Sequence, residues 1–296
     1  MKVAIIGAAG KTGSALATRM LDGGHEVRAL VHALGRAQHL AQQGAEIIAF
    51  DLNDEESTRA ALVGAEGVYY CSPLAAGQED PFGIEYSWGR HVLAGAKSTG
   101  TKHLVFLSIQ GPETAPGVKM LETKRKLEKD LAASGLPHTV LRANTFMDNP
   151  GTLAKEELLA GRFSWPLSPN AVVQPVAVSD IAEVAAQALN CGPKNRVFNV
   201  LGPDPLTLSE MMEIIGRALG RQIEYVELSD EEFVARLGPF IGTPLAQALA
   251  ATYRLWEREG AVGDTAPVQR EFGISMTSCE DYACGLAKAW KSEGLI

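Results

Sequence analysis

Residues 3–13 read Val-Ala-Ile-Ile-Gly-Ala-Ala-Gly-Lys-Thr-Gly, and this stretch decides the fold. A short apolar strand runs into a turn with three glycines, and a helix follows. Gly7 permits the tight exit from the strand, Gly10 lets the backbone approach a pyrophosphate, and Gly13 lets helix and strand pack closely. The free N–H groups at the helix N-terminus favour an anion. The stretch predicts a dinucleotide-binding turn, with a purely structural glycine turn as the alternative.

Short apolar runs alternate with amphipathic stretches through the first half of the chain. Strands are predicted at 3–6, 26–31, 46–50, 67–71, 103–107 and 138–141, and helices at 12–21, 36–43, 53–62, 83–98 and 118–134. Strands that alternate with helices of this length indicate parallel βαβ units. Nearly continuous apolar strands indicate helices on both faces of the sheet. The predicted fold is therefore α/β, with a doubly wound parallel Rossmann sheet.

The second half is less regular and mostly helical. Strands are predicted at 174–178, 196–200 and 223–227, and helices at 153–159, 180–190, 209–219, 230–237, 244–259 and 279–291. This pattern predicts a Rossmann domain of residues 1–150 plus about 174–202. A smaller, mostly helical cap would comprise about 151–173 plus 203–296 and bind the substrate in a cleft against the first domain.

Composition excludes several classes of protein. With 296 residues, 46% of them hydrophobic, the chain can bury a large core without disulfide or metal staples. Its net charge of −8 argues against a nucleic-acid partner. Four scattered cysteines indicate a reduced, cytoplasmic setting, and the spacing of histidines and cysteines predicts no metal site. No apolar stretch is long enough to span a membrane. The oligomeric state stays open, with a homodimer as one alternative.

The end of the second strand bears on which dinucleotide binds. NAD sites carry Asp or Glu there to accept the ribose 2′-hydroxyl. Here the strand ends at His32 without a carboxylate. His32 and Arg36, together with Lys11 from the turn, favour a 2′-phosphate, and the alternative is that they are ordinary solvated side chains. NADP is therefore the predicted cofactor, with NAD as the alternative.

An ordered set of motifs resembles the NmrA-like group of atypical short-chain dehydrogenases/reductases. The matching segments are 7–13, 50–52, 100–108, 124–128, 134–142, 146–149, 176–181, 199–203 and 206–210. The likeness covers nearly the whole chain. It implies a Rossmann core, NAD(P) binding, and one of two functions: reduction of a small carbonyl, quinone or similar acceptor, or redox sensing without turnover.

The resemblance also implies roles for individual residues at the adenine and ribose ends of the cofactor. Asp51 would accept a hydrogen bond from the adenine amino group while Leu52 packs against the ring; the alternative for Asp51 is a cap for the next helix. The backbone at Ser72 and Pro73 would border the ribose and diphosphate, in the crevice where such sheets bind ligands.

At the reacting end, the resemblance implies that Lys124 faces the nicotinamide ribose and that Ser108 donates to a substrate carbonyl. The alternatives are a solvated lysine and a hydroxyl that caps its own strand end. Asn144, Thr145 and Phe146 would lie near the nicotinamide. The expected cofactor-binding set is Gly7, Gly10, Lys11, Thr12, Gly13, His32, Arg36, Asp51, Leu52, Ser72, Pro73, Lys124, Asn144 and Phe146. Arg125, Lys126 and Lys129 are interpreted as solvated charges, and Asp180 as a helix cap.

The usual tyrosine acid of this superfamily is absent, because no tyrosine is followed four residues later by lysine. Met120 stands four residues before Lys124, and methionine has no proton to donate. Three hypotheses follow: protonation by Lys124 or water, an acceptor such as a quinone or enone that needs little acid catalysis, or a non-catalytic redox sensor acting through a protein partner. We expect an NAD(P)H-dependent reductase of a small, apolar substrate, with the sensor as the alternative.

Aromatic side chains in the expected cap are candidates to contact such a substrate. They are Phe163, Trp165, Phe233, Phe240 and Trp256. The alternative is that they form the ordinary core of the cap. Tyr86 and Tyr253 are two further tyrosines that could donate a proton from outside the usual position.

Overall fold

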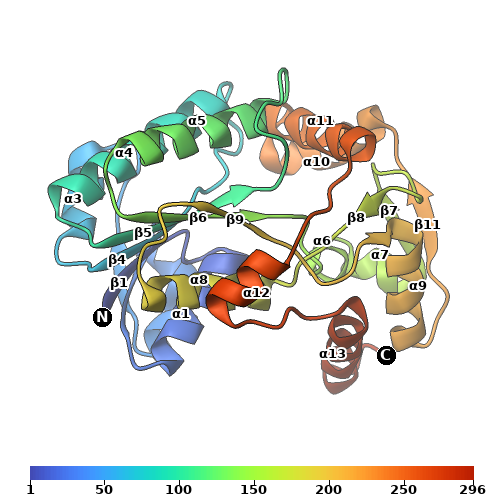
Figure 1. Cartoon of the computed structure of the whole chain (residues 1–296). Coiled ribbons are helices and arrows are strands. Elements are labelled where there is room, and N and C mark those ends of the chain that lie inside the picture. The colour runs from blue at the N-terminus through green and yellow to red at the C-terminus, as the bar shows by residue number, and fades with distance from the viewer.

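A seven-stranded, wholly parallel sheet of order β3-β2-β1-β4-β5-β6-β9 forms the centre of the computed structural model, which describes all 296 residues (Figure 1). The strands are β1 Lys2–Ile6, β2 Glu26–Val31, β3 Glu46–Ala49, β4 Gly67–Cys71, β5 His103–Ile109, β6 His138–Ala143 and β9 Val197–Val200. The order reverses between β1 and β4, and in open α/β sheets ligands bind at the carboxyl ends of the strands at such a switch point. The predicted Rossmann fold is confirmed.

Helices cover both faces of this sheet (Figure 1). One face is covered by α3 Glu55–Leu62, α4 Pro81–Ser98 and α5 Lys119–Ala133. The other is covered by α1 Lys11–Asp22, η1 Leu34–Ala37, α2 Gln38–Gln42, α8 Val178–Cys191 and α12 Ala266–Phe272.

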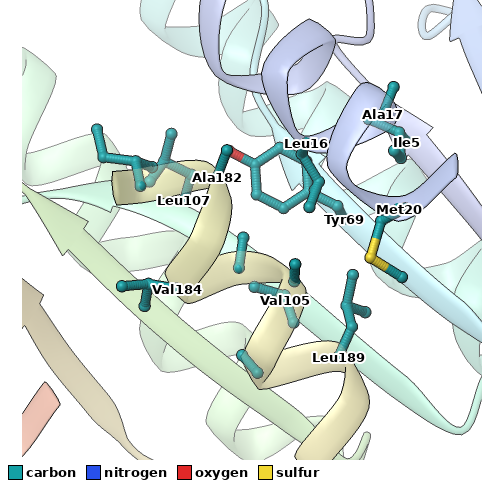
Figure 2. Packing of buried hydrophobic residues seen from close by; sticks show 14 of the residues in the cluster. Ile5, Leu16, Ala17, Met20, Tyr69, Val105, Leu107, Ala182, Val184 and Leu189 are labelled. Atoms are coloured by element: carbon teal, nitrogen blue, oxygen red, sulfur yellow. The ribbon is translucent and has the colours of Figure 1, made fainter. Parts of the chain in front are cut away.

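Alternation along the strands divides the apolar core into two layers. Ile5, Tyr69 and Val105 face α1 and α8, where they meet Leu16 and Leu189 (Figure 2). Their neighbours in the sequence point to the opposite face, toward α4 and α5. Both faces of the sheet are therefore buried, which explains why the strands are apolar almost throughout.

The remaining elements gather beyond the carboxyl edge of the sheet (Figure 1). They are α6 Asn149–Leu153, α7 Lys155–Leu159, β7 Arg162–Trp165, β8 Val172–Val173, β10 Leu206–Thr207, α9 Leu208–Leu219, β11 Glu224–Glu227, α10 Asp230–Ile241, α11 Thr243–Glu259 and α13 Cys279–Ser292. β7 pairs with β11 in parallel, and β8 pairs with β10 antiparallel. These elements bury apolar clusters of their own, apart from the two layers at the sheet.

The second half of the chain departs from the predicted elements in several places. Residues 174–178 form no strand: Pro175 lacks an N–H, only an isolated bridge joins Val176 to Phe146, and α8 already begins at Val178. Helix α12 was not predicted, and it packs on the sheet side, where the Phe272 and Phe198 rings lie 4.9 Å apart. None of the helices has the length and apolar character needed to cross a bilayer.

Candidate functional site

The glycine turn after β1 lies at the same sheet edge as the ends of β4, β5 and β6. Gly7 adopts φ +86°, and a Cβ there would lie 2.7 Å from the carbonyl oxygen of Cys71. A Cβ on Gly13 would overlap the Gly7 carbonyl, and Gly10 N–H donates to that same carbonyl at 2.9 Å. Side chains at Gly7 and Gly13 would therefore break the turn.

The first turn of α1 presents unpaired backbone donors. Its N-cap residue, Gly10, provides no side-chain cap. The N–H groups of Lys11, Thr12 and Gly13 have no protein acceptor, whereas Ser14 N–H already donates to the Gly10 carbonyl. Three free N–H groups at the positive end of a helix fit a diphosphate group. A dinucleotide cofactor is thus compatible with the turn on its own geometry.

Lys11 and Thr12 use their side chains differently. Lys11 Nζ donates to Thr152 Oγ1 at 2.5 Å and to Asn149 Oδ1 at 3.3 Å, so it joins α1 to α6. Burial lowers the pKa of Lys11, and the nearby Asp148 opposes this. Thr12 is buried, and its hydroxyl donates to Cys71 Sγ at 3.7 Å. The Lys11 ammonium is therefore bonded to two side chains of α6 within the protein.

His32 and Arg36 lie together beyond the end of β2. His32 follows the last residue of the strand, and Arg36 belongs to the 3-10 turn η1 that comes directly after it. Both side chains are exposed and neither makes a hydrogen bond or ion pair within the protein. They are free to meet an anionic group at this edge.

Asp51 and Leu52 follow β3. The carboxylate of Asp51 accepts from the backbone N–H and the side-chain amide of Asn53, both at 2.9 Å. Asp54, not Asp51, caps α3 by accepting from Glu56 N–H. The alternative role of Asp51 as the helix cap is therefore wrong. Leu52 is buried in the layer beneath α3 and α4.

Ser72 and Pro73 begin the loop between β4 and α4. Ser72 is half-buried and its hydroxyl lies 3.4 Å from the Pro73 carbonyl. Farther along this loop, Gly77 N–H donates to the Ile241 carbonyl at 3.1 Å. The loop that leaves β4 is thus bonded to the end of α10.

Lys124 forms a buried ion pair. Its Nζ lies 2.5 Å from Glu85 Oε1, and both side chains are about one-tenth exposed, at 9% and 11%. The ammonium also lies 5.4 Å from the centre of the Phe106 ring of β5. The pair also acts on the pKa of Cys71, the last residue of β4. Burial raises this pKa, the Lys124 charge lowers it, and the Glu85 charge raises it. Lys124 is therefore not a solvated surface lysine.

Ser108 belongs to a different buried cluster. It is 2% exposed, and its hydroxyl donates to Glu128 Oε1 at 2.5 Å. Glu128 also accepts from Arg125 and Arg142. The Ser108 hydroxyl is therefore engaged inside the protein, and this placement argues against the expected contact with a substrate carbonyl.

Arg125 is buried, so the expectation that it is a solvated charge is wrong. Besides Glu128, it donates to the backbone carbonyls of Ile109, Gly111 and Pro112. Ile109 ends β5, and Gly111 and Pro112 belong to the loop that follows it. The guanidinium therefore fixes that loop at the carboxyl edge of the sheet.

Asn144 and Phe146 come directly after β6. The buried Asn144 amide donates to the Ala261 carbonyl at 2.6 Å, and its oxygen accepts from Thr145 N–H. Phe146 is half-buried and forms the isolated bridge with Val176. Both residues lie at the same sheet edge as the glycine turn, and Asn144 ties that edge to the segment after α11.

Asp180 does not cap α8. Its carboxylate accepts from the N–H and hydroxyl of Thr277, at 2.6 and 2.7 Å. The first N–H of α8, that of Val178, is instead bonded by Asp148 Oδ2 at 2.8 Å. Asp148 is 30 residues away in sequence, so no local pattern reveals this cap.

Most aromatic candidates of the second half pack against one another. Phe163, Phe233 and Trp256 are buried, and the Trp165 ring lies 5.5 Å from that of Phe233. Tyr253 is buried in the same cluster, and burial raises its pKa. Tyr86 donates to Asp130 at 2.7 Å. Phe240 stands apart, because it is 79% exposed.

Three buried charged residues were not predicted as part of the site: Glu85, Glu128 and Arg142. A signal for Glu85 exists in α4, whose buried positions are Pro81, Glu85, Gly89, Val92, Gly95 and Ala96. These recur at helical spacing, so Glu85 is a charged residue within an apolar stripe. No three His, Cys, Asp or Glu side chains come together in a way that could hold a metal ion.

Comparison with known proteins gives consistent results. The sequence model of the NmrA-like family matches residues 1–283. Quinone oxidoreductase 2 of Escherichia coli is 27% identical over 281 residues, which cover 93% of this chain and 95% of that protein. The photosystem II assembly factor Ycf39 of Synechocystis sp. is 24% identical over 291 residues, covering 95% and 89%. A crystal structure of the NADPH-dependent quinone oxidoreductase QOR2 from E. coli, complexed with NADPH, superimposes with a TM-score of 0.80 at 26% identity, covering 96% of this chain and 99% of that one.

Proposed function

We propose that this chain, which belongs to the NmrA-like family, is a reductase that binds NADPH and reduces a small, apolar carbonyl, enone or quinone. The similarity to a quinone oxidoreductase over nearly the whole of both chains supports this proposal. The single observation that carries it is the turn of Gly7, Gly10 and Gly13, where three backbone donors lie free and a side chain at Gly7 or Gly13 would clash with the backbone.

The residues that would hold the cofactor follow the sheet edge. The N–H groups of Lys11, Thr12 and Gly13 would bind the diphosphate, and His32 and Arg36 would bind the 2′-phosphate. Asp51 and Leu52 would border the adenine, and the backbone at Ser72 and Pro73 the ribose. Lys124, Asn144 and Phe146 would line the nicotinamide end. The elements beyond the sheet edge, including α10 and α11, would form the opposite wall as the substrate-binding cap.

The reduced nicotinamide supplies the hydride when bound, and the protein must orient the acceptor and deliver a proton. Met120 occupies the position of the usual tyrosine acid and is buried against Leu245 and Ala248, so it contributes packing only. The ammonium of Lys124 would be the cationic donor, beside Phe106 of β5 and near Cys71 at the end of β4. A quinone or enone suits such a site, because positioning supplies most of the rate for an acceptor that needs little acid catalysis.

The test is a spectrophotometric assay of NADPH oxidation with a panel of quinones, enones and aldehydes. Gly13→Ala serves as the control that keeps the rest of the site but blocks the turn. We expect oxidation with at least one acceptor class and none with the control. An absence of oxidation across the panel, despite binding of NADPH by calorimetry, would contradict the reductase.

Binding of NADPH without oxidation of any acceptor would favour a cofactor-binding regulator. The similarity to a photosystem II assembly factor is the observation that supports this candidate. A regulator of this kind would bind a protein partner differently in the presence of NADPH and NADP⁺. A pull-down with each form of the cofactor would measure that difference.

A further inference from the structure

Glu85 is a charged residue at a buried position, where its desolvation costs free energy. It occupies the buried stripe of α4, between Pro81 and Gly89, and it faces α5. Replacement of a buried ion pair by apolar residues of similar volume is often neutral or stabilising. The pair of Glu85 and Lys124 therefore needs an explanation other than stability.

The packing of two helices brings this pair together. A Cβ on Gly89 would overlap the side chain of Leu127, so α4 and α5 approach each other closely at this point. Glu85 lies one turn before Gly89, and Lys124 lies one turn before Leu127. The close approach therefore sets the carboxylate 2.5 Å from the ammonium at the ligand edge of the sheet.

Lys124 is held from two sides and keeps donors to spare. Glu85 lies on one side and the Phe106 ring on another, at 5.4 Å from its centre. The Phe106 ring is itself stacked on Tyr70, with the ring centres 5.4 Å apart. An ammonium has three N–H donors, and no acceptor besides Glu85 bonds Lys124 within the protein. Two donors are thus left for a ligand.

We propose that Glu85 is the positioning residue of the nicotinamide site, where it fixes the Lys124 ammonium so that its free donors meet the cofactor ribose. Glu85 itself contacts neither cofactor nor acceptor. Its carboxylate holds the Lys124 side chain in one buried position between α4 and α5. This inference rests on the proposed cofactor site and adds a residue that the family likeness did not indicate.

The experiment uses three variants of the full chain: Glu85→Gln, Lys124→Met, and the double variant Glu85→Leu/Lys124→Met. The double variant replaces the pair with apolar side chains of similar length. Glu66→Gln is the control, because it removes the partner of Lys102 in an exposed ion pair. Each protein is measured for Tm, for the Kd of NADPH by calorimetry, and for kcat and KM with the best acceptor.

We expect Glu85→Gln to raise the Kd of NADPH about tenfold, the size of one lost hydrogen bond from a charged donor. It should lower kcat roughly ten- to hundredfold, because the remaining lysine is misplaced. The KM for the acceptor should change little. The double variant should recover the Tm of the wild type while its Kd and kcat stay impaired, and Glu66→Gln should match the wild type in all three.

Two results would overturn the proposal. One is that Glu85→Gln matches the wild type in Kd and kcat. The other is that the double variant recovers cofactor binding along with its Tm, which would make the pair a packing feature. Failure of the proposed reductase would give a different result, because the wild type would then oxidise no acceptor. The Kd of NADPH would still test the role of Glu85 in that case.

Discussion

Gly89 of α4 lies directly against Leu127 of α5, with no room between them for even one methyl group. Because overpacking forces neighbours apart, Gly89→Ala should destabilise the fold by about 1–3 kcal/mol. It should also separate Glu85 from Lys124 and weaken NADPH binding. Gly285→Ala is the matched control, since a Cβ there would meet nothing within 4 Å. Denaturant titration and calorimetry would measure both effects; equal stability of the two variants would contradict the close packing.

Gly13→Ala should abolish cofactor binding. The added methyl group would overlap the Gly7 carbonyl, so the turn must open and its three free N–H groups must move. We expect the Kd of NADPH to rise at least a hundredfold, by more than about 2.7 kcal/mol. Calorimetry measures this directly. Near-normal affinity in a folded variant would show that the diphosphate does not dock at this turn.

Arg36→Ala should discriminate between the two dinucleotides. The Arg36 side chain is exposed and bonds to nothing in the protein, so its removal should leave stability unchanged. A charge-assisted contact to a phosphate contributes about 1.5–3 kcal/mol. We therefore expect NADPH affinity to fall roughly tenfold or more while NADH affinity is unaffected. Equal losses for both cofactors would disprove the assignment of the 2′-phosphate.

His103 should make stability depend on pH. Burial, with His138 and Lys194 nearby, lowers its pKa to about 4 from the usual 6.5. The unfolded chain therefore takes up the proton first, so this contribution is complete above about pH 6.5 and is lost as the pH falls toward 4. At about 1.4 kcal/mol per pKa unit, the loss reaches roughly 3 kcal/mol.

The variant His103→Gln tests this dependence, because its amide can still bond Thr139, the partner of the imidazole, but cannot titrate. Urea unfolding of both proteins from pH 7 to pH 4 gives the free energy of unfolding at each pH, and the two proteins should differ in how steeply this free energy falls with pH. Identical slopes would show that His103 does not titrate in this range.

Arg142→Met should be costly. The guanidinium bonds the buried carboxylate of Glu128 and the exposed Glu113, and its loss leaves Glu128 with only Arg125 and the Ser108 hydroxyl as partners. Breaking a buried pair costs about 3–5 kcal/mol when the remaining charge has no other partner, and we expect a loss near the lower end of this range because Arg125 still pairs with Glu128. The exposed pair of Lys102 with Glu66 offers the comparison, since Lys102→Met should cost less than about 1 kcal/mol. Similar losses for both variants would contradict a buried network.

The sheet and the glycine turn could be predicted because their signals are local. Apolar runs mark each central strand, and the spacing of Gly7, Gly10 and Gly13 requires a tight turn before a helix. Strand and helix boundaries in the first half agree with the structure to within a few residues.

The polar interior of the site could not be predicted in the same way. Lys124 pairs with Glu85 of another helix, and the Ser108 hydroxyl donates to Glu128 of the helix that follows its strand. Each of these buried polar side chains therefore depends on a partner that is distant in sequence. Arg125 was interpreted as a solvated charge, yet it is buried and bonds Glu128. Asp148 caps α8 from 30 residues away, which no spacing rule anticipates.

Helix α12 gives the C-terminal third of the chain an unexpected route. After α11 the polypeptide returns to the sheet, buries Val268 and Phe272 there, and then leaves again to form α13. The elements beyond the sheet edge are thus connected to the sheet by a second crossing of the chain. An exchange of the elements beyond the sheet edge between homologues, made to change substrate preference, should therefore leave residues 266–274 in place. Otherwise the exchange would remove Val268 and Phe272 from the apolar layer on this face of the sheet.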